Sequence, residues 1–99
     1  MRLSGIIFLF ILALNSSAQD GAKIYTEYCA SCHGDKGQGV ADEYDEALVG
    51  KKSIASLTKY IHKSMPEDNE DAVINDDARQ VSEYMYHAFY SPKAQAKLK

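Results

Sequence analysis

The sequence predicts a small all-α fold with three main helices. Apolar residues recur at helical spacing in three segments, at about residues 20–32, 53–63 and 75–90. No alternating strand pattern surrounds the most distinctive run, Cys29-Ala30-Ser31-Cys32-His33. In that run two thiols and one imidazole stand three and four positions apart, and such positions share one face of a helix. The three side chains are therefore expected to converge on one edge of a ligand.

The first helix is predicted to run from about Asp20 to Cys32. Asp20 is a suitable N-cap, and Gly34 follows the helix as a suitable C-cap. The residues at helical spacing are Ile24, Tyr25, Tyr28, Cys29 and Cys32. The C-terminal end of this helix therefore carries the cysteine run.

The sequence C-x-x-C-H is the attachment sequence for a covalently held haem. Each thiol adds to one vinyl group, and the adjacent imidazole binds the iron. Cys29 and Cys32 are the only cysteines of the chain. A thioredoxin-like cysteine pair needs a βαβ context, which is not predicted here. A disulfide between the two cysteines would not require His33. A zinc site needs four ligands, and the remaining candidates, His62 and His87, lack a paired spacing. We therefore expect one haem c, with its iron bound by His33.

Three glycines, Gly34, Gly37 and Gly39, follow the cysteine run. A phosphate-binding glycine loop needs a strand before it, and here a helix comes first. We expect this turn to let the backbone wrap closely around the haem edge. The run at residues 42–46 is predicted to be an acidic surface loop, and Leu48-Val49-Gly50 to return to the core.

Ser53 is predicted to cap a second helix that ends at about Lys63. The apolar stripe of this helix consists of Ile54, Leu57 and Ile61. Met65-Pro66 ends it, because a proline disfavours helical geometry at the residue before it. Residues 67–71 are acidic and predicted to be a loop.

The last helix is predicted to run from a cap at Asn75 or Asp76 to about Tyr90. Its packing stripe consists of Val81, Tyr84, Met85 and Ala88, with Phe89 beside it. Ser91-Pro92 ends the helix, and the polar, basic tail at residues 93–99 is predicted to fray.

Met65 is the predicted sixth ligand of the iron. It lies far downstream of the cysteine run, in a non-helical segment fixed by Pro66, so it can reach the opposite haem face. A thioether ligand favours reduced iron and raises the reduction potential. Met85 is assigned to core packing instead, because it stands on a helical stripe.

Other side chains stay open as alternatives to Met65. His62 stands one helical turn earlier and is the main rival. His87, beside the stripe of the last helix, is a weaker candidate. Lys51 and Lys52 could bind iron only after losing a proton, which is unfavourable near neutral pH.

Residues 1–18 are predicted to be a signal peptide. Arg2 supplies a basic start, residues 5–14 an apolar run too short to span a bilayer, and Ser16-Ser17-Ala18 a cleavage site. An uncleaved anchor is the alternative. Cleavage leaves no membrane anchor and predicts a periplasmic or otherwise exported protein, with a single domain at residues 19–92.

The charge of the chain is acidic. The formal net charge is −3, and the loss of Arg2 with the signal peptide makes it −4. A net acidic protein does not bind nucleic acid by neutralising phosphates. We expect a monomer whose partners are redox proteins with a basic docking patch.

The combined pattern resembles the small class I c-type cytochromes over essentially all of the mature sequence. The shared motifs are Gly21-x-x-x-Tyr25-x-x-x-Cys29-Ala30-Ser31-Cys32-His33-Gly34, Leu48-Val49-Gly50, Met65-Pro66 and Val81-x-x-Tyr84. The resemblance implies a cytochrome c-like fold, in which the first and last helices cross closely. Glycine lacks a side chain and allows such an approach, so Gly21 and Tyr25 are expected to meet Val81 and Tyr84.

The chain departs from this family at one position. Family members usually carry a proline before the Leu-x-Gly segment, and its carbonyl accepts a hydrogen bond from the proximal histidine. Ala47 stands there in this chain. Its backbone carbonyl can serve equally, but the orientation of His33 depends on it.

The predicted function is that of a one-electron carrier and not of an enzyme. No Ser-His-Asp set, pair of catalytic carboxylates or second metal site is visible in the sequence. Two alternatives remain: the haem subunit or module of a larger dehydrogenase or oxidase system, and a sensor with five-coordinate iron.

Overall fold

A computed structural model describes residues 17–99 of the chain. The predicted signal peptide lies outside the described residues, except for its last two positions. None of the helices within residues 17–99 combines the length and the hydrophobicity needed to cross a bilayer. This part contains no β-strand, in agreement with the predicted all-α class. Its helices are α2 (Ser17–Tyr28), α3 (Ala30–His33), α4 (Ile54–Ser64), α5 (Asn75–Met85), the π-helix η1 (Tyr86–Tyr90) and α6 (Pro92–Lys97).

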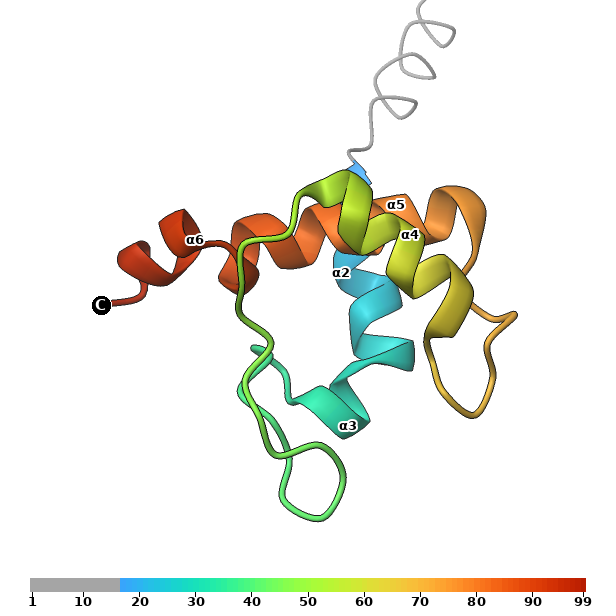
Figure 1. The fold of residues 1–99 in the computed structure, drawn as a ribbon, viewed down its shortest axis with the longest axis horizontal. Coiled ribbons are helices and arrows are strands. Elements are labelled where there is room, and N and C mark those ends of the chain that lie inside the picture. Colours follow the sequence, from blue (N-terminus) through green and yellow to red (C-terminus); the bar gives the residue numbers. More distant parts are fainter. Residues whose placement is uncertain (1–16) are drawn as a thin grey trace, which may run out of the picture.

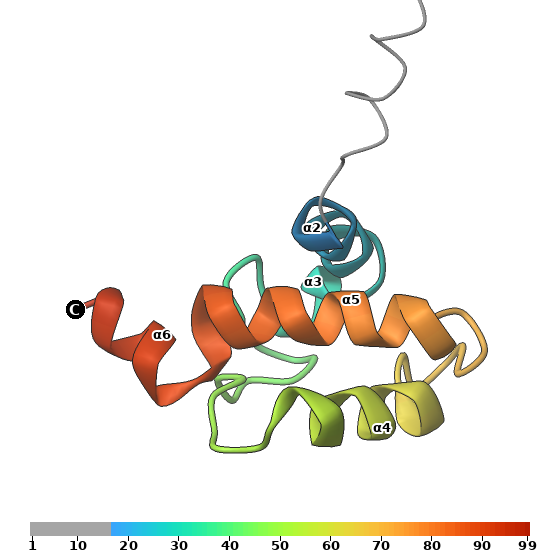
Figure 2. The same cartoon turned by 90° about the horizontal axis from the view of Figure 1, so that it is seen from above.

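Helix α5 is the centre of the fold. Figure 2 shows α5 between α2 and α4, with α2 seen end-on and α4 running alongside. The loop between α3 and α4 passes below α2 and rises to α4 (Figure 1). The predicted arrangement of three main helices is therefore confirmed.

Helices α2 and α5 approach each other closely at Gly21. A Cβ atom at this position would collide with the carbonyl oxygen of Gln80 and would lie 2.8 Å from the Cβ of Tyr84. Only a glycine fits here without moving one of the helices. The predicted crossing of the first and last helices through Gly21 and Tyr84 is confirmed.

Aromatic side chains fill the space beside this crossing. Tyr25 is 1% exposed, and its ring centre lies 5.7 Å from that of Tyr84 and 5.3 Å from that of Phe89. The Tyr25 hydroxyl donates a buried hydrogen bond of 2.6 Å to the carbonyl oxygen of Gly34. Burial raises the pKa of Tyr25 above its usual value. Tyr25 therefore ties the segment after the cysteine run to the core.

The first predicted helix is two helices in the structure. Helix α2 begins at Ser17, so the prediction that Asp20 caps it is wrong; Asp20 lies in its first turn. The helix breaks at Cys29, whose φ of −119° lies outside the helical range, and α3 continues from Ala30. Gly34 ends α3 with a φ of 89°, as predicted.

Helix α4 agrees closely with the prediction. The Ser53 hydroxyl accepts a hydrogen bond from the backbone N–H of Ser56 and caps the helix. Leu57 and Ile61 are buried on its inner face. Met65 follows in an extended conformation, as expected for a residue that precedes a proline.

The start of α5 differs from the prediction. Ile74 occupies the cap position, and neither Asn75 nor Asp76 caps the helix with its side chain. The Nδ1 atom of His62 on α4 accepts a 2.9 Å hydrogen bond from the backbone N–H of Asn75. A residue from another helix therefore supplies the acceptor, and helical spacing within one segment could not indicate this.

The C-terminal region is more ordered than predicted. Helix α5 changes at Tyr86 into the π-helix η1, which Ser91 ends. The Ser91 hydroxyl then accepts a hydrogen bond from the backbone N–H of Ala94 and starts α6. Ala94 is buried. The tail was predicted to fray, but it forms a short helix because Ser91 and Pro92 are also good helix-starting residues.

Gly21→Leu is expected to lower the free energy of unfolding by about 1–3 kcal/mol or more, because the added side chain overpacks a close helix crossing. Thermal unfolding of the protein with its cofactor measures the change. Lys23→Leu, at an exposed position of the same helix, is the control and should have little effect. Equal stability of the two variants would contradict this crossing.

Candidate functional site

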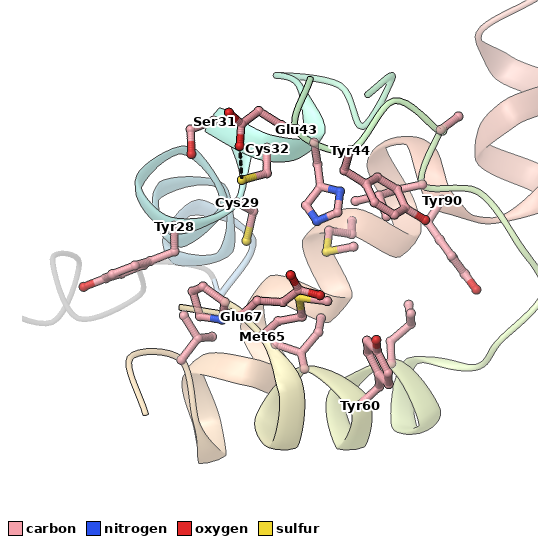
Figure 3. A pocket seen from close by; sticks show the side chains of 18 of the residues that line it. Tyr28, Cys29, Ser31, Cys32, Glu43, Tyr44, Tyr60, Met65, Glu67 and Tyr90 are labelled. Carbon is pink, nitrogen blue, oxygen red and sulfur yellow. Dashed lines mark hydrogen bonds between the residues drawn. The ribbon is translucent and has the colours of Figure 1, made fainter. Parts of the chain in front are cut away.

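One cavity lies between the cysteine-bearing segment and α4. It has a volume of about 670 Å³, within the usual range of roughly 300–1,000 Å³ for ligand and cofactor pockets. Its wall includes the buried residues Leu57, Ile61, Val73 and Met85. Figure 3 shows the cysteines on one side and Met65 on another. The cavity wall is therefore mainly apolar, and it also carries sulfur and imidazole groups.

The three residues of the C-x-x-C-H motif all line this cavity. The helical turn of α3 brings them together, because the backbone N–H of His33 bonds to the carbonyl oxygen of Cys29 at 3.0 Å. Both thiols are free, with Cys29 half-buried and Cys32 exposed. Burial, followed by the nearby Cys32, raises the pKa of Cys29 to about 11. The Cys32 Sγ donates to Oε1 of Glu43 at 3.6 Å.

His33 is held from one side by an aromatic ring. Tyr44 packs edge-on against its imidazole, with 4.7 Å between the ring centres. Its Nδ1 atom is buried and has no hydrogen-bond partner among the described residues. Burial lowers the pKa of His33, and the charge of Glu67 opposes this effect. The expected hydrogen bond from the His33 imidazole to the backbone carbonyl of Ala47 is therefore not formed in this structure.

Two thioethers reach the cavity. Met65 is half-buried in the extended segment after α4. Met85, on α5, is 5% exposed and packs in the core as predicted, but it also lines the cavity. The sequence does not indicate this second role of Met85. The position of a residue on the packing stripe of a helix does not show whether its side chain faces a cavity.

The alternative iron ligands fall into two groups. His62, His87 and Lys51 do not line the cavity, whereas Lys52 does. His62 is engaged at the start of α5 through its Nδ1 atom. His87 is exposed and packs edge-on against Tyr86. Of the two histidines considered as rivals of Met65, neither reaches the cavity.

Tyr90 closes the end of the cavity away from the cysteines (Figure 3). Its hydroxyl accepts a 3.2 Å hydrogen bond from the backbone N–H of Lys52, and its carbonyl oxygen accepts one of 3.0 Å from Gly50. A Cβ atom at Gly50 would lie 2.5 Å from the Tyr90 hydroxyl oxygen. From the sequence Tyr90 is expected only at a helix end, because the π-helix that contains it has no clear sequence signal.

Both acidic runs are exposed at the cavity. Glu43 comes from the first run, and Glu67 and Asp68 from the second. The two runs are separated by 20 residues of sequence, including α4, and the fold brings them to the same cavity. The negative charge of the chain is therefore partly concentrated there.

A family comparison decides what this arrangement is. The model of the family described as cytochrome c oxidase, cbb3-type, subunit III matches residues 16–85. The chain belongs to this family. It is a haem-binding, electron-transfer cytochrome with an all-α, cytochrome c-like fold, as the sequence predicted. No individually curated protein matches the chain.

The cavity of this cytochrome fits a haem. It offers two free thiols, one imidazole and two thioethers in a single apolar chamber. One feature departs from the usual pattern: metal-ligating histidines usually donate their other N–H to an acceptor, whereas the buried Nδ1 atom of His33 has no partner among the described residues. The donor set has the soft sulfur and imidazole atoms that axial and covalent haem attachment require.

Proposed function

We propose that this cytochrome is an exported, monohaem c-type electron carrier that moves one electron at a time between redox partners. The observation that carries the proposal is the convergence of Cys29, Cys32, His33 and Met65 on one cavity. Residues 1–18 act as the signal peptide that delivers the chain to the periplasm, residues 19–92 form the domain, and residues 93–99 form a basic tail. Cytochrome c domains are typically exported, which supports this location.

Each of the four residues has a separate task. Cys29 and Cys32 attach the porphyrin covalently, so the cofactor is retained through every cycle. His33 and Met65 would hold the iron, and the haem would supply a one-electron ferric–ferrous couple. Because both side chains would stay bound in both oxidation states, little rearrangement would accompany a transfer.

The remaining wall residues control the environment. Leu57 and Ile61 exclude water from the site, which favours the less charged, reduced form of the iron. Tyr44 limits the rotation of the His33 ring. Tyr90 fixes the segment from Gly50 to Lys52, which closes the end of the cavity away from the cysteines. These described residues thus provide a rigid and mainly apolar wall for the cofactor.

A second candidate role is that of a haem subunit within a larger oxidase system. The description of the matching family, which names an oxidase subunit, favours it. The electron chemistry is the same in both cases, and only the assembly differs. Purification from the native source separates them, because a subunit copurifies with a catalytic chain whereas the proposed carrier elutes as a monomer. A sensor with five-coordinate iron is opposed by Met65, which lines the cavity.

Covalent attachment is expected at both cysteines. The mass of the denatured mature protein should equal that of residues 19–99 plus one haem. Cys29→Ala and Cys32→Ala should each leave one thioether, and the double variant none. Haem that extracts into acidified organic solvent from the parent protein would contradict the proposal.

Met65→Leu is expected to open one axial position of the iron, because leucine keeps the volume of the side chain but lacks its sulfur. The reduction potential should fall, and cyanide or carbon monoxide should bind more readily. Met85→Leu is the matched control, since it removes the other thioether that lines the cavity. Survival of the low-spin spectrum in Met65→Leu and its loss in His62→Ala would identify His62 as the ligand instead.

Docking of a basic partner is expected to depend on the acidic run at residues 67–71. Changing Asp68, Glu70 and Asp71 to their amides should slow bimolecular electron transfer to such a partner and flatten its salt dependence. Stopped-flow rates at several ionic strengths measure both quantities. An unchanged rate and salt slope would mean that these carboxylates serve only solubility.

A further inference from the structure

Glu67 is the cavity-lining acidic residue that stands nearest to Met65 in the sequence. It lines the cavity and stands two residues after Met65. In the close view its side chain reaches inward over Met65 (Figure 3). Glu43 and Asp68 also line the cavity, but Glu43 belongs to the loop after α3, and Asp68 stands one residue further from Met65.

The charge of Glu67 acts across the cavity. Glu67 lines the cavity from the loop after α4, and His33 lines it from α3. Because the two side chains lie on separate walls, the field of this carboxylate crosses the space between His33 and the Met65 segment. Any group bound there is exposed to the same field.

A negative charge near iron favours the more positively charged oxidation state. Ferric haem carries one more positive charge than ferrous haem, so a nearby carboxylate stabilises the ferric form and lowers the reduction potential. A Met ligand and apolar walls act in the opposite direction. The potential therefore reflects a balance in which Glu67 opposes its neighbours.

We propose that Glu67 is a potential-setting residue that holds the reduction potential of this cytochrome below the value given by its axial ligands and apolar walls. The proposal rests on the proposed function, since it requires haem in the cavity. It assigns a separate role to one carboxylate of the acidic run: Glu67 acts on the iron, whereas Glu70 and Asp71, which do not line the cavity, act on the partner.

The effect has a predictable size. Glu67 is an exposed residue, so solvent screens its charge strongly. Coulomb's law with an effective dielectric constant between that of a protein surface and that of water gives a change of about two- to tenfold in the equilibrium constant for reduction. Part of this change should disappear at high ionic strength, because salt screens an exposed charge.

The test measures reduction potentials of the purified holoprotein at neutral pH and low salt. Glu67→Gln should make reduction about two- to tenfold more favourable, and Glu67→Asp, which keeps the charge, should restore much of the parent value. Glu70→Gln is the matched control, because Glu70 belongs to the same run but does not line the cavity. Its effect should be clearly smaller, and the difference between the two glutamine variants should shrink as salt is added.

Two outcomes would overturn the proposal. Equal potentials of Glu67→Gln and Glu70→Gln would show that the cavity position of Glu67 is irrelevant. Loss of the low-spin spectrum in Glu67→Gln would show that Glu67 holds the Met65 segment in place and acts by structure. A parent protein without covalent haem would instead refute the proposed function, so the two failures are distinguishable.

Discussion

The close crossing of α2 and α5 at Gly21 is the constraint on which the rest of the structure depends. Because Gly21 has no side chain, α2 lies directly against the Gln80–Tyr84 turn of α5. That approach buries Tyr25, whose hydroxyl holds the carbonyl of Gly34. Since α5 also packs against α4, the same helix fixes the wall that carries Met65. The spacing of the two cavity walls thus follows from one helix crossing.

The cavity combines rigid and adaptable parts. Tyr25 and the α3 turn fix the cysteine segment, and Tyr90 fixes the chain at Gly50 to Lys52. The Met65 segment is different, because it lies in a loop whose following residues are exposed carboxylates. The proposed iron ligand Met65 and the proposed potential-setting residue Glu67 therefore come from the same short loop. This arrangement lets the charge pattern change without disturbing the helix packing.

Much of this structure could be predicted from local sequence. Helix periodicity and the Ser53 cap predict α4. The motif C-x-x-C-H indicates which wall of the cavity carries the thiols. The failures are those of long-range contacts. The cap of α5 comes from His62 on another helix, and Tyr90 enters the cavity through a π-helix. The spacing of residues along the chain does not show that Met85 lines the cavity or that the Nδ1 atom of His33 has no partner among the described residues.

The optical spectrum of the purified protein, oxidised and reduced, tests the central claim most directly. The account predicts one haem per chain, low-spin in both states, with absorption bands of a thioether-linked haem that has histidine and methionine as axial ligands. A high-spin spectrum, or one typical of two histidines, would contradict the pairing of His33 with Met65 across the cavity. A spectrum without haem would contradict the account as a whole.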